Sequence, residues 1–252
     1  MFMGKVKDGS TCIASELKMM YDVVETVEQF KPGCWMELGE GTYHRWYDYV
    51  YPIVGTEEKE VMKQIRTKLC AAIDKRLMSD RPIGCLLSGG LDSSLVTALV
   101  ARKFEKGKLK TFSVGLEGSE DLKFARMVAD HCGTDHHEII VTKEEMLEEI
   151  ENDIVQIETW DTTTIRASTP MFLMSKYIKE KTDCTVIYSG EGADEASGSY
   201  MYFHKAPSPE EFQKESVRLM FDLIYYDVLR CDKSTAGAGL EVRVPFLDKD
   251  FL

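Results

Sequence analysis

The sequence lacks the long apolar run that a membrane helix requires. None of its stretches approaches the roughly 20 consecutive apolar residues that span a bilayer. The first ten residues, MFMGKVKDGS, also lack the apolar core of a secretion signal. These absences predict a cytoplasmic protein with no membrane partner.

A surplus of basic residues is missing as well. The 43 acidic residues outnumber the 31 basic ones and give a formal charge of -12. We therefore expect no nucleic-acid partner, because phosphate backbones are bound by basic surfaces. Any anionic ligand must be held by a local arrangement of donors.

The seven cysteines include no CxxC motif and no closely spaced pair, which predicts reduced, mostly buried thiols. A metal site is the alternative interpretation of one cluster, formed by His131, Cys132, His136 and His137. Its spacing matches no common zinc pattern, and it lies where a helix is expected to run into a strand. A structural role is therefore favoured.

The sequence does contain an alternation of short apolar runs and amphipathic helices, in a chain of 252 residues that can bury a full core. The expected strands are 83–87, 109–115, 137–141 and 184–188. The expected helices are 93–104, 121–131, 143–155 and 170–181. One further helix, with apolar residues at 61, 65, 69 and 73, precedes them, and a helical stretch at about 209–230 follows. This order predicts an α/β fold with a parallel twisted sheet, helices on both faces, and ligands at the carboxyl ends of the strands.

The first 50 or so residues have a different pattern. They contain short apolar runs, turn signals at Gly9-Ser10 and Pro32-Gly33, and a strand-like segment at 33–38. We expect residues 1–52 to be the short β-rich end of another domain and residues 53–252 to form the main domain.

The segment Ser88-Gly89-Gly90-Leu91-Asp92-Ser93-Ser94 leaves a buried strand, turns through two glycines and enters a helix. Glycines let the backbone approach a ligand, and the hydroxyls of Ser88, Ser93 and Ser94 add donors beside the first N–H groups of the helix. Neither a Walker lysine nor the G-x-G-x-x-G spacing is present. The segment predicts a pyrophosphate-type site; a Ser/Gly turn with a capping aspartate is the alternative.

A second glycine-rich segment, Ser189-Gly190-Glu191-Gly192-Ala193-Asp194-Glu195, follows the expected strand 184–188. Three carboxylates in one loop are unfavourable unless a cation or an ammonium group neutralises them. We expect Asp92 and Asp194 to hold Mg²⁺ against the phosphates of ATP, with a solvated acidic loop as the alternative.

Between these two segments lies Glu158 to Ser168, which contains Thr163, Thr164 and Arg166. An arginine can bind a carboxylate through two parallel hydrogen bonds while threonine hydroxyls fix its orientation. A polar helix start with a surface arginine is the simpler interpretation of this segment taken alone.

Five motifs, in this order, closely resemble the synthetase domain of glutamine-dependent asparagine synthetases: SGGLDSS, TTIRAS, SGEGADE, YFHKAPSP and GLEVRVPFLD. The resemblance covers roughly residues 55–252. Residues 1–50 resemble the tail of that family's glutaminase domain, through Lys7-Asp8-Gly9 and the segment 14–18.

The resemblance implies an ATP-pyrophosphatase fold, similar to that of the adenine nucleotide alpha hydrolases. It implies that the side-chain carboxylate of aspartate attacks the α-phosphate of ATP, and that ammonia then displaces AMP. By motif, the adenylate contacts would be Leu86, Val114, Ser189 and Gly190, and the pyrophosphate contacts Ser88, Gly90, Asp92 and Ser93. Thr163, Thr164 and Arg166 would hold aspartate, and Glu191 would deprotonate the incoming ammonium with Asp227 and Arg230 nearby.

Three features depart from the family pattern. Phe2 follows Met1 where the family has a catalytic cysteine, so we expect nitrogen from ammonia or from a separate glutaminase chain; a homodimer is a second possible partnership. No residue is assigned the role of a lysine that the family places beyond the Val244-Pro245-Phe246 motif. The segment Glu195-Ala196-Ser197-Gly198-Ser199-Tyr200 stands where the family usually has an apolar or aromatic residue and a second glycine.

Two alternatives stay open on the sequence alone. A β-lactam synthetase type of enzyme has a similar acidic loop, although TTIRAS and YFHKAPSP favour the asparagine enzyme. A remnant that binds ATP without useful catalysis is the alternative from a different functional class.

Overall fold

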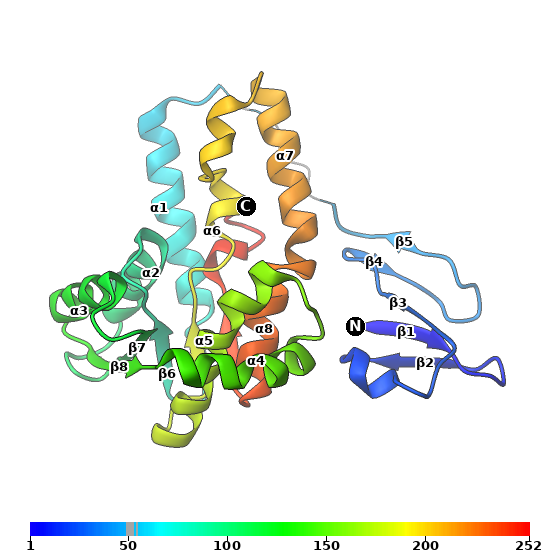
Figure 1. Ribbon diagram of the computed structural model, residues 1–252. Coiled ribbons are helices and arrows are strands. Elements are labelled where there is room, and N and C mark those ends of the chain that lie inside the picture. Colours follow the sequence, from blue (N-terminus) through cyan, green and yellow to red (C-terminus); the bar gives the residue numbers. More distant parts are fainter. Residues whose placement is uncertain (49–52, 54) are drawn as a thin grey trace. The chain divides into compact units, whose positions relative to one another are not determined.

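The computed structural model describes residues 1–48, 53 and 55–252, and these form two compact units, Met1–Pro52 and Ile53–Leu252 (Figure 1). The predicted boundary after residue 52 falls beside residues 49–52, which lie outside the described residues. Within the described part, no helix has both the length and the apolar character to cross a membrane.

The smaller unit is built from short antiparallel strands. Strands β1 (Phe2–Lys5), β2 (Thr11–Ala14) and β3 (Thr26–Gln29) pair in the order β2-β1-β3, and β4 (Cys34–Trp35) pairs with β5 (His44–Arg45). A 3-10 turn, Leu17–Met20, follows β2. The expected strand at 33–38 is therefore only two residues long. The origin of this unit in a glutaminase domain stays a prediction.

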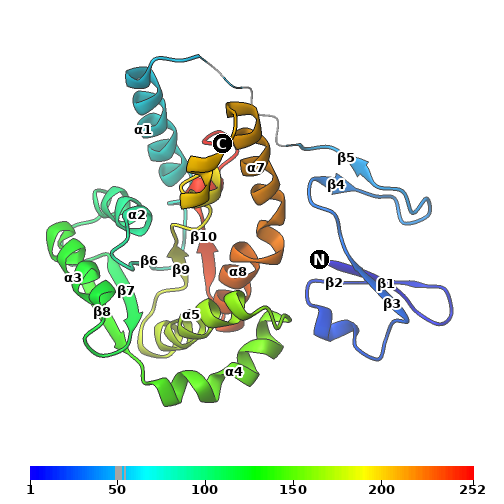
Figure 2. The same cartoon turned by 45° about the horizontal axis from the view of Figure 1, so that its top comes forward.

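The larger unit contains a parallel five-stranded sheet. Its strands are β6 (Ile83–Leu86), β7 (Lys110–Gly115), β8 (Asp135–Ile140), β9 (Val186–Tyr188) and β10 (Glu241–Arg243), in the order β10-β9-β6-β7-β8. Figure 2 shows β8 and β10 at the two edges. Strand β10 was not predicted, since three residues with exposed and half-buried side chains give almost no hydrophobic signal.

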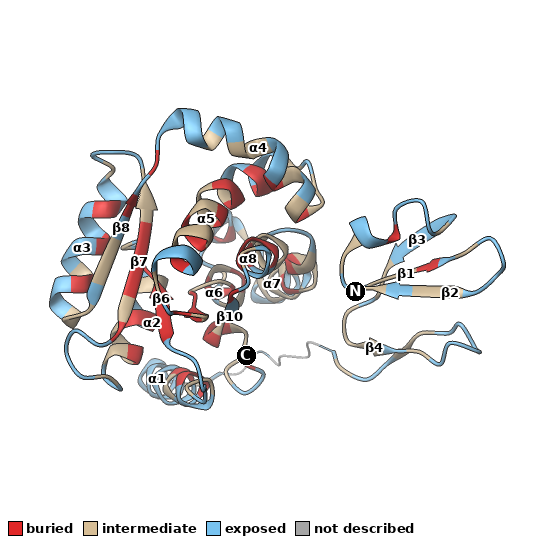
Figure 3. Cartoon of the chain, turned by 90° about the horizontal axis from the view of Figure 1, so that it is seen from below, coloured by how far each residue is buried: buried red, intermediate tan, exposed pale blue. Residues whose placement is uncertain are grey.

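Helices cover both faces of this sheet, which confirms the predicted α/β fold (Figure 3). On one side lie α1 (Glu58–Lys75), α2 (Leu91–Ala101) and α3 (Glu120–Cys132), and on the other α4 (Lys143–Ile157), α5 (Thr162–Lys181) and α8 (Asp227–Gly237). Successive strand residues point to opposite faces of the sheet and so contribute to two separate cores. Cys85 and Tyr188 pack with α1 and α2, whereas Leu86 and Ile187 pack with α5.

The remaining elements lie between β9 and the last described residues. Helices α6 (Ala193–Ser197) and α7 (Pro209–Asp222) are accompanied by 3-10 turns at Met201–Lys205, Leu223–Tyr225 and Pro245–Leu247. The expected helical stretch at about 209–230 is helical but divided, since α7 ends at Asp222 and α8 begins at Asp227 after a 3-10 turn. The backbone leaves the helical region at Tyr226, which separates α7, packed on α6, from α8, packed on α5. Tertiary packing decides this break, and helical periodicity does not reveal it.

Helix α5 also begins earlier than predicted, at Thr162 instead of residue 170. The Asp161 carboxylate accepts hydrogen bonds from the backbone N–H and the hydroxyl of Thr164, each at 2.8 Å. This side-chain cap satisfies an amide that would otherwise lack a partner in the first turn. The segment Thr163 to Ser168 is therefore helical.

Candidate functional site

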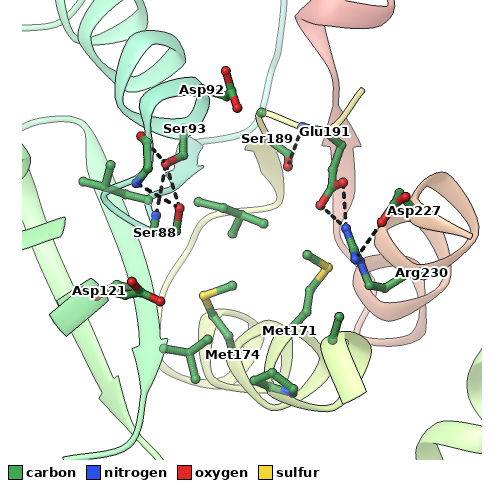
Figure 4. A pocket seen from close by; sticks show the side chains of 18 of the residues that line it. Ser88, Asp92, Ser93, Asp121, Met171, Met174, Ser189, Glu191, Asp227 and Arg230 are labelled. Atoms are coloured by element: carbon green, nitrogen blue, oxygen red, sulfur yellow. Dashed lines mark hydrogen bonds and ion pairs between the residues drawn. The ribbon is translucent and has the colours of Figure 1, made fainter. Parts of the chain in front are cut away.

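A cavity of about 440 Å³ lies at the carboxyl ends of β6, β7 and β9 (Figure 4). From β6 the chain proceeds outward through β7 and β8, then crosses to the other side of β6 to form β9. The strand order thus reverses between β6 and β9. Open parallel sheets bind ligands at such a reversal, because the loops that leave the two strands diverge there.

The loop after β6 holds its own shape through serine side chains. The hydroxyl oxygens of Ser88 and Ser93 lie 2.9 Å apart, the Gly90 N–H donates to Ser88 Oγ at 3.3 Å, and Ser93 Oγ donates to the Gly90 carbonyl at 3.2 Å. Gly89 has a φ of 85°, and a Cβ there would lie 2.6 Å from the Ala125 nitrogen. Only glycine fits at this position.

Helix α2 begins directly after Gly90, and no side chain within the described part caps its first turn. N–H groups at the start of a helix have no acceptor within the helix, and Asp92 and Ser93 of this turn line the cavity. Together with the helix dipole these N–H groups form a site suited to a phosphate group.

The loop after β9 touches the loop after β6. An ideal Cβ on Gly190 would lie 3.0 Å from the Ser93 nitrogen and 3.2 Å from the Asp92 Cβ. Such approaches are tighter than a normal carbon contact, so the absence of a side chain at Gly190 permits this arrangement. The two glycine-bearing loops form one continuous wall of the cavity.

Acidic side chains dominate the lining. The cavity wall carries one guanidinium, that of Arg230. It also carries six carboxylates, those of Asp92, Asp121, Glu191, Asp194, Glu195 and Asp227. Burial and the nearby charge of Asp194 raise the pKa of Asp92. A polyphosphate cannot enter such a cavity unless cations accompany it.

Asp92 and Asp194, the carboxylates expected to hold Mg²⁺, both line the cavity, and their binding of the ion stays a prediction. Among the described residues, no three His, Cys, Asp or Glu side chains gather closely enough to hold a metal by themselves. Mg²⁺ is commonly held by one or two carboxylates together with substrate phosphates and water, and this pair matches that donor set.

Glu191 forms the third part of the site. Arg230 donates to both of its carboxylate oxygens, at 2.9 and 2.8 Å, and also pairs with Asp227 at 2.8 Å (Figure 4). Burial raises the pKa of Glu191, while the charge of Arg230 partly opposes this rise. The site thus holds a carboxylate that accepts a proton more readily than an exposed glutamate does.

The family model of asparagine synthase matches residues 64–210 and 206–252. The chain belongs to the asparagine synthase family. The glutamine-hydrolysing asparagine synthetase of Homo sapiens is 42% identical over 281 residues, which cover 100% of this chain and 50% of the relative. That of Triphysaria versicolor is 47% identical over 263 residues, which cover 100% of this chain and 44% of the relative. The chain spans about half the length of the curated relatives it matches.

Among solved structures, an NH3-dependent NAD synthetase from Campylobacter jejuni is similar over 71% of this chain and 96% of that chain, with 16% identity and a TM-score of 0.39.

Most of the residues assigned by resemblance to the asparagine synthase family meet at the cavity. Its lining includes Leu86, Ser88, Gly90, Asp92, Ser93, Val114, Ser189, Gly190, Glu191, Asp227 and Arg230. Asp194, expected from the acidic loop as a metal ligand, lines it as well. Gly89 lies in the loop after β6 and Ser94 in the first turn of α2, but neither lines the wall. In the described structure Thr163, Thr164 and Arg166 do not line it either, although Ala167 and Pro170 of the same helix do. Aspartate binding by these three residues stays a prediction.

Several lining residues were not predicted to act here. Asp121 projects into the cavity from the first turn of α3, and Met171 and Met174 of α5 form an apolar wall (Figure 4). Tyr200 donates a hydrogen bond to the buried Glu195. The sequence did contain one indication for Asp121, since it lies at the start of the helix that follows β7. The carboxyl end of β7 borders the cavity.

Proposed function

We propose that this site uses ATP to activate the side-chain carboxylate of aspartate and then transfers ammonia to it, which yields asparagine, AMP and pyrophosphate. The observation that carries the proposal is the contact of the loop 88–94 with the loop 189–194 around an acidic cavity. Membership of the asparagine synthase family supports the use of ATP.

In the first step an oxygen of the aspartate side chain attacks the α-phosphorus of ATP. The bond from that phosphorus to the bridging oxygen breaks, and pyrophosphate leaves. Ser88, Ser93 and the first N–H groups of α2 would hold the departing phosphates; both serines line the cavity. Mg²⁺ bound by Asp92 and Asp194 would neutralise phosphate charge that these carboxylates otherwise repel.

In the second step ammonia attacks the activated carbonyl carbon, and AMP leaves with the bonding electrons. Ammonium must lose a proton before it can attack. We assign that proton to Glu191, because burial raises its pKa and Arg230 holds its two oxygens in place. Asp227 in turn fixes Arg230.

Aspartate would be held by Thr163, Thr164 and Arg166. They lie in the first two turns of α5, directly before Ala167 and Pro170, which line the cavity. Arg166 is exposed, so its guanidinium is available to a carboxylate ligand. The apolar wall of Met171 and Met174 suits the flat adenine ring.

The test is a mixture of purified protein, Mg-ATP, L-aspartate and either ammonium or glutamine. Equal amounts of AMP, pyrophosphate and asparagine are expected with ammonium, and the parallel reaction with glutamine identifies the nitrogen donor. Tight ATP binding without AMP formation would favour a nucleotide-binding remnant. Pyrophosphate release with other carboxylates but not with aspartate would favour a β-lactam synthetase type of activity.

A further inference from the structure

Glu158 and Lys233 form a buried ion pair outside the cavity. Lys233 Nζ donates to Glu158 Oε2, and the two side chains are only 5% and 6% exposed. Removing two charges from water is costly, and deleting one partner of such a pair leaves an uncompensated buried charge. Neither residue lines the cavity or has a part in the steps above.

Glu158 lies at a conformationally constrained position. It ends α4 with a φ of 63°, in the left-handed region that residues other than glycine seldom adopt. Three residues later Asp161 caps α5. The connection from Glu158 to Asp161 therefore determines where the first turn of α5 begins.

Lys233 lies on α8, three residues after Arg230, and α8 packs along α5. The Lys233 carbonyl also accepts a hydrogen bond from Gln156 Nε2 at 3.3 Å, which ties the end of α4 to the same turn of α8. Helix α8 brings Asp227 and Arg230 to the cavity, while α5 brings Ala167 and Pro170. The ion pair thus joins α8 to the connection that leads from α4 into α5.

We propose that Glu158 and Lys233 are positioning residues that hold the start of α5 in register with α8. The amino-acid-binding turn, with Thr163 and Arg166, would then stay at a set distance from Glu191 and Arg230. This inference rests on the proposed function for the identity of the amino acid. The phosphate-binding loop after β6 lies between β6 and α2, away in the chain from both partners, so its geometry should not depend on the pair.

The test compares Glu158→Gln and Lys233→Met with Lys176→Met. Lys176 forms the control pair, with Glu149 at 2.8 Å between α5 and α4, and its side chain is 37% exposed. Pyrophosphate release is measured against aspartate at saturating ATP and against ATP at saturating aspartate. Backbone hydrogen exchange is followed in peptides covering residues 159–166 and 86–94.

We expect the two buried-pair variants to need about tenfold more aspartate for half-maximal rate, because small displacements of a substrate-binding group lower rates steeply. Their ATP requirement should change less than about twofold, and exchange should accelerate at 159–166 but not at 86–94. Lys176→Met should resemble the wild type in all of these measurements.

The double variant Glu158→Leu with Lys233→Met separates positioning from stability. Thermal unfolding should return toward the wild type, since no unpaired charge stays buried, while the aspartate requirement stays raised. Recovery of the normal aspartate requirement would overturn the proposal, as would equal changes for both substrates or unchanged exchange at 159–166. If the wild-type protein showed no aspartate-dependent reaction, the proposed function would fail, yet the exchange comparison would still decide this inference.

Discussion

Replacing Gly190 with alanine tests the contact between the two loops most directly. The new methyl would lie 3.0 Å from the Ser93 nitrogen, 3.1 Å from the Asp92 carbonyl carbon and 3.2 Å from the Asp92 Cβ. Ordinary contacts begin near 3.4 Å, so the loops must separate by a few tenths of an ångström. The φ of Gly190 lies outside the left-handed region, and the backbone itself would not be strained.

The functional effect should exceed the effect on stability. A misplacement of about 1 Å can lower a rate roughly 100-fold, so a shift of a few tenths should cost about tenfold in pyrophosphate release. The methyl would also cover the Ser93 N–H, which should weaken ATP binding measured by calorimetry. Gly55→Ala is the matched control, because a Cβ there meets nothing within 4 Å. An unchanged rate and ATP affinity in Gly190→Ala would refute the role of this contact.

Three further predictions concern single side chains. Arg166→Ala should raise the aspartate concentration needed for half-maximal rate while leaving ATP binding intact, and an unaltered aspartate dependence would remove its assigned role. Burial raises the pKa of Glu191, so as the pH is lowered the rate of asparagine formation should begin to fall at a higher pH than an ordinary glutamate would give. Glu191→Gln should be slower by about 10²–10⁴, and its pH-rate profile should lack this decrease at acidic pH. Burial lowers the pKa of His136 to about 4 from 6.5, so on acidification the unfolded chain takes up a proton at this residue at a higher pH than the folded protein does. The free energy of unfolding should therefore fall by about 2 kcal/mol from pH 7 to pH 5. Urea unfolding of His136→Gln should show a correspondingly weaker pH dependence, and an equal dependence in both proteins would contradict this linkage.

The structural role expected for the cluster around His136 follows from cross-strand hydrogen bonds that no spacing rule encodes. Its ring nitrogens lie 2.8 Å from Thr111 Oγ1 and 3.1 Å from Ser113 Oγ, both on the neighbouring strand β7. These partners satisfy a neutral imidazole between two strands. Periodicity predicted both strands but could not give the register that brings these side chains together.

The part of the site that sequence reasoning predicted best is local. The segment 88–94 is short, and its strand, turn and helix are all determined by neighbouring residues, so its phosphate-binding geometry could be anticipated. Asp227 and Arg230 are different, because their approach to Glu191 depends on the break before α8. Only the family resemblance pointed to them, and Asp121 was missed for the same reason: its position depends on how α3 packs.

The place of β9 in the sheet has a consequence for biosynthesis. Strands β6, β7 and β8 are neighbours both in the chain and in space, so they can assemble as soon as residue 140 has left the ribosome. Strand β9 must instead enter beside β6, where Val186 pairs with Ile83, after the intervening helices have been translated. During synthesis the serine loop is thus complete well before its acidic counterpart, and a nascent chain should acquire nucleotide affinity abruptly, when β9 docks.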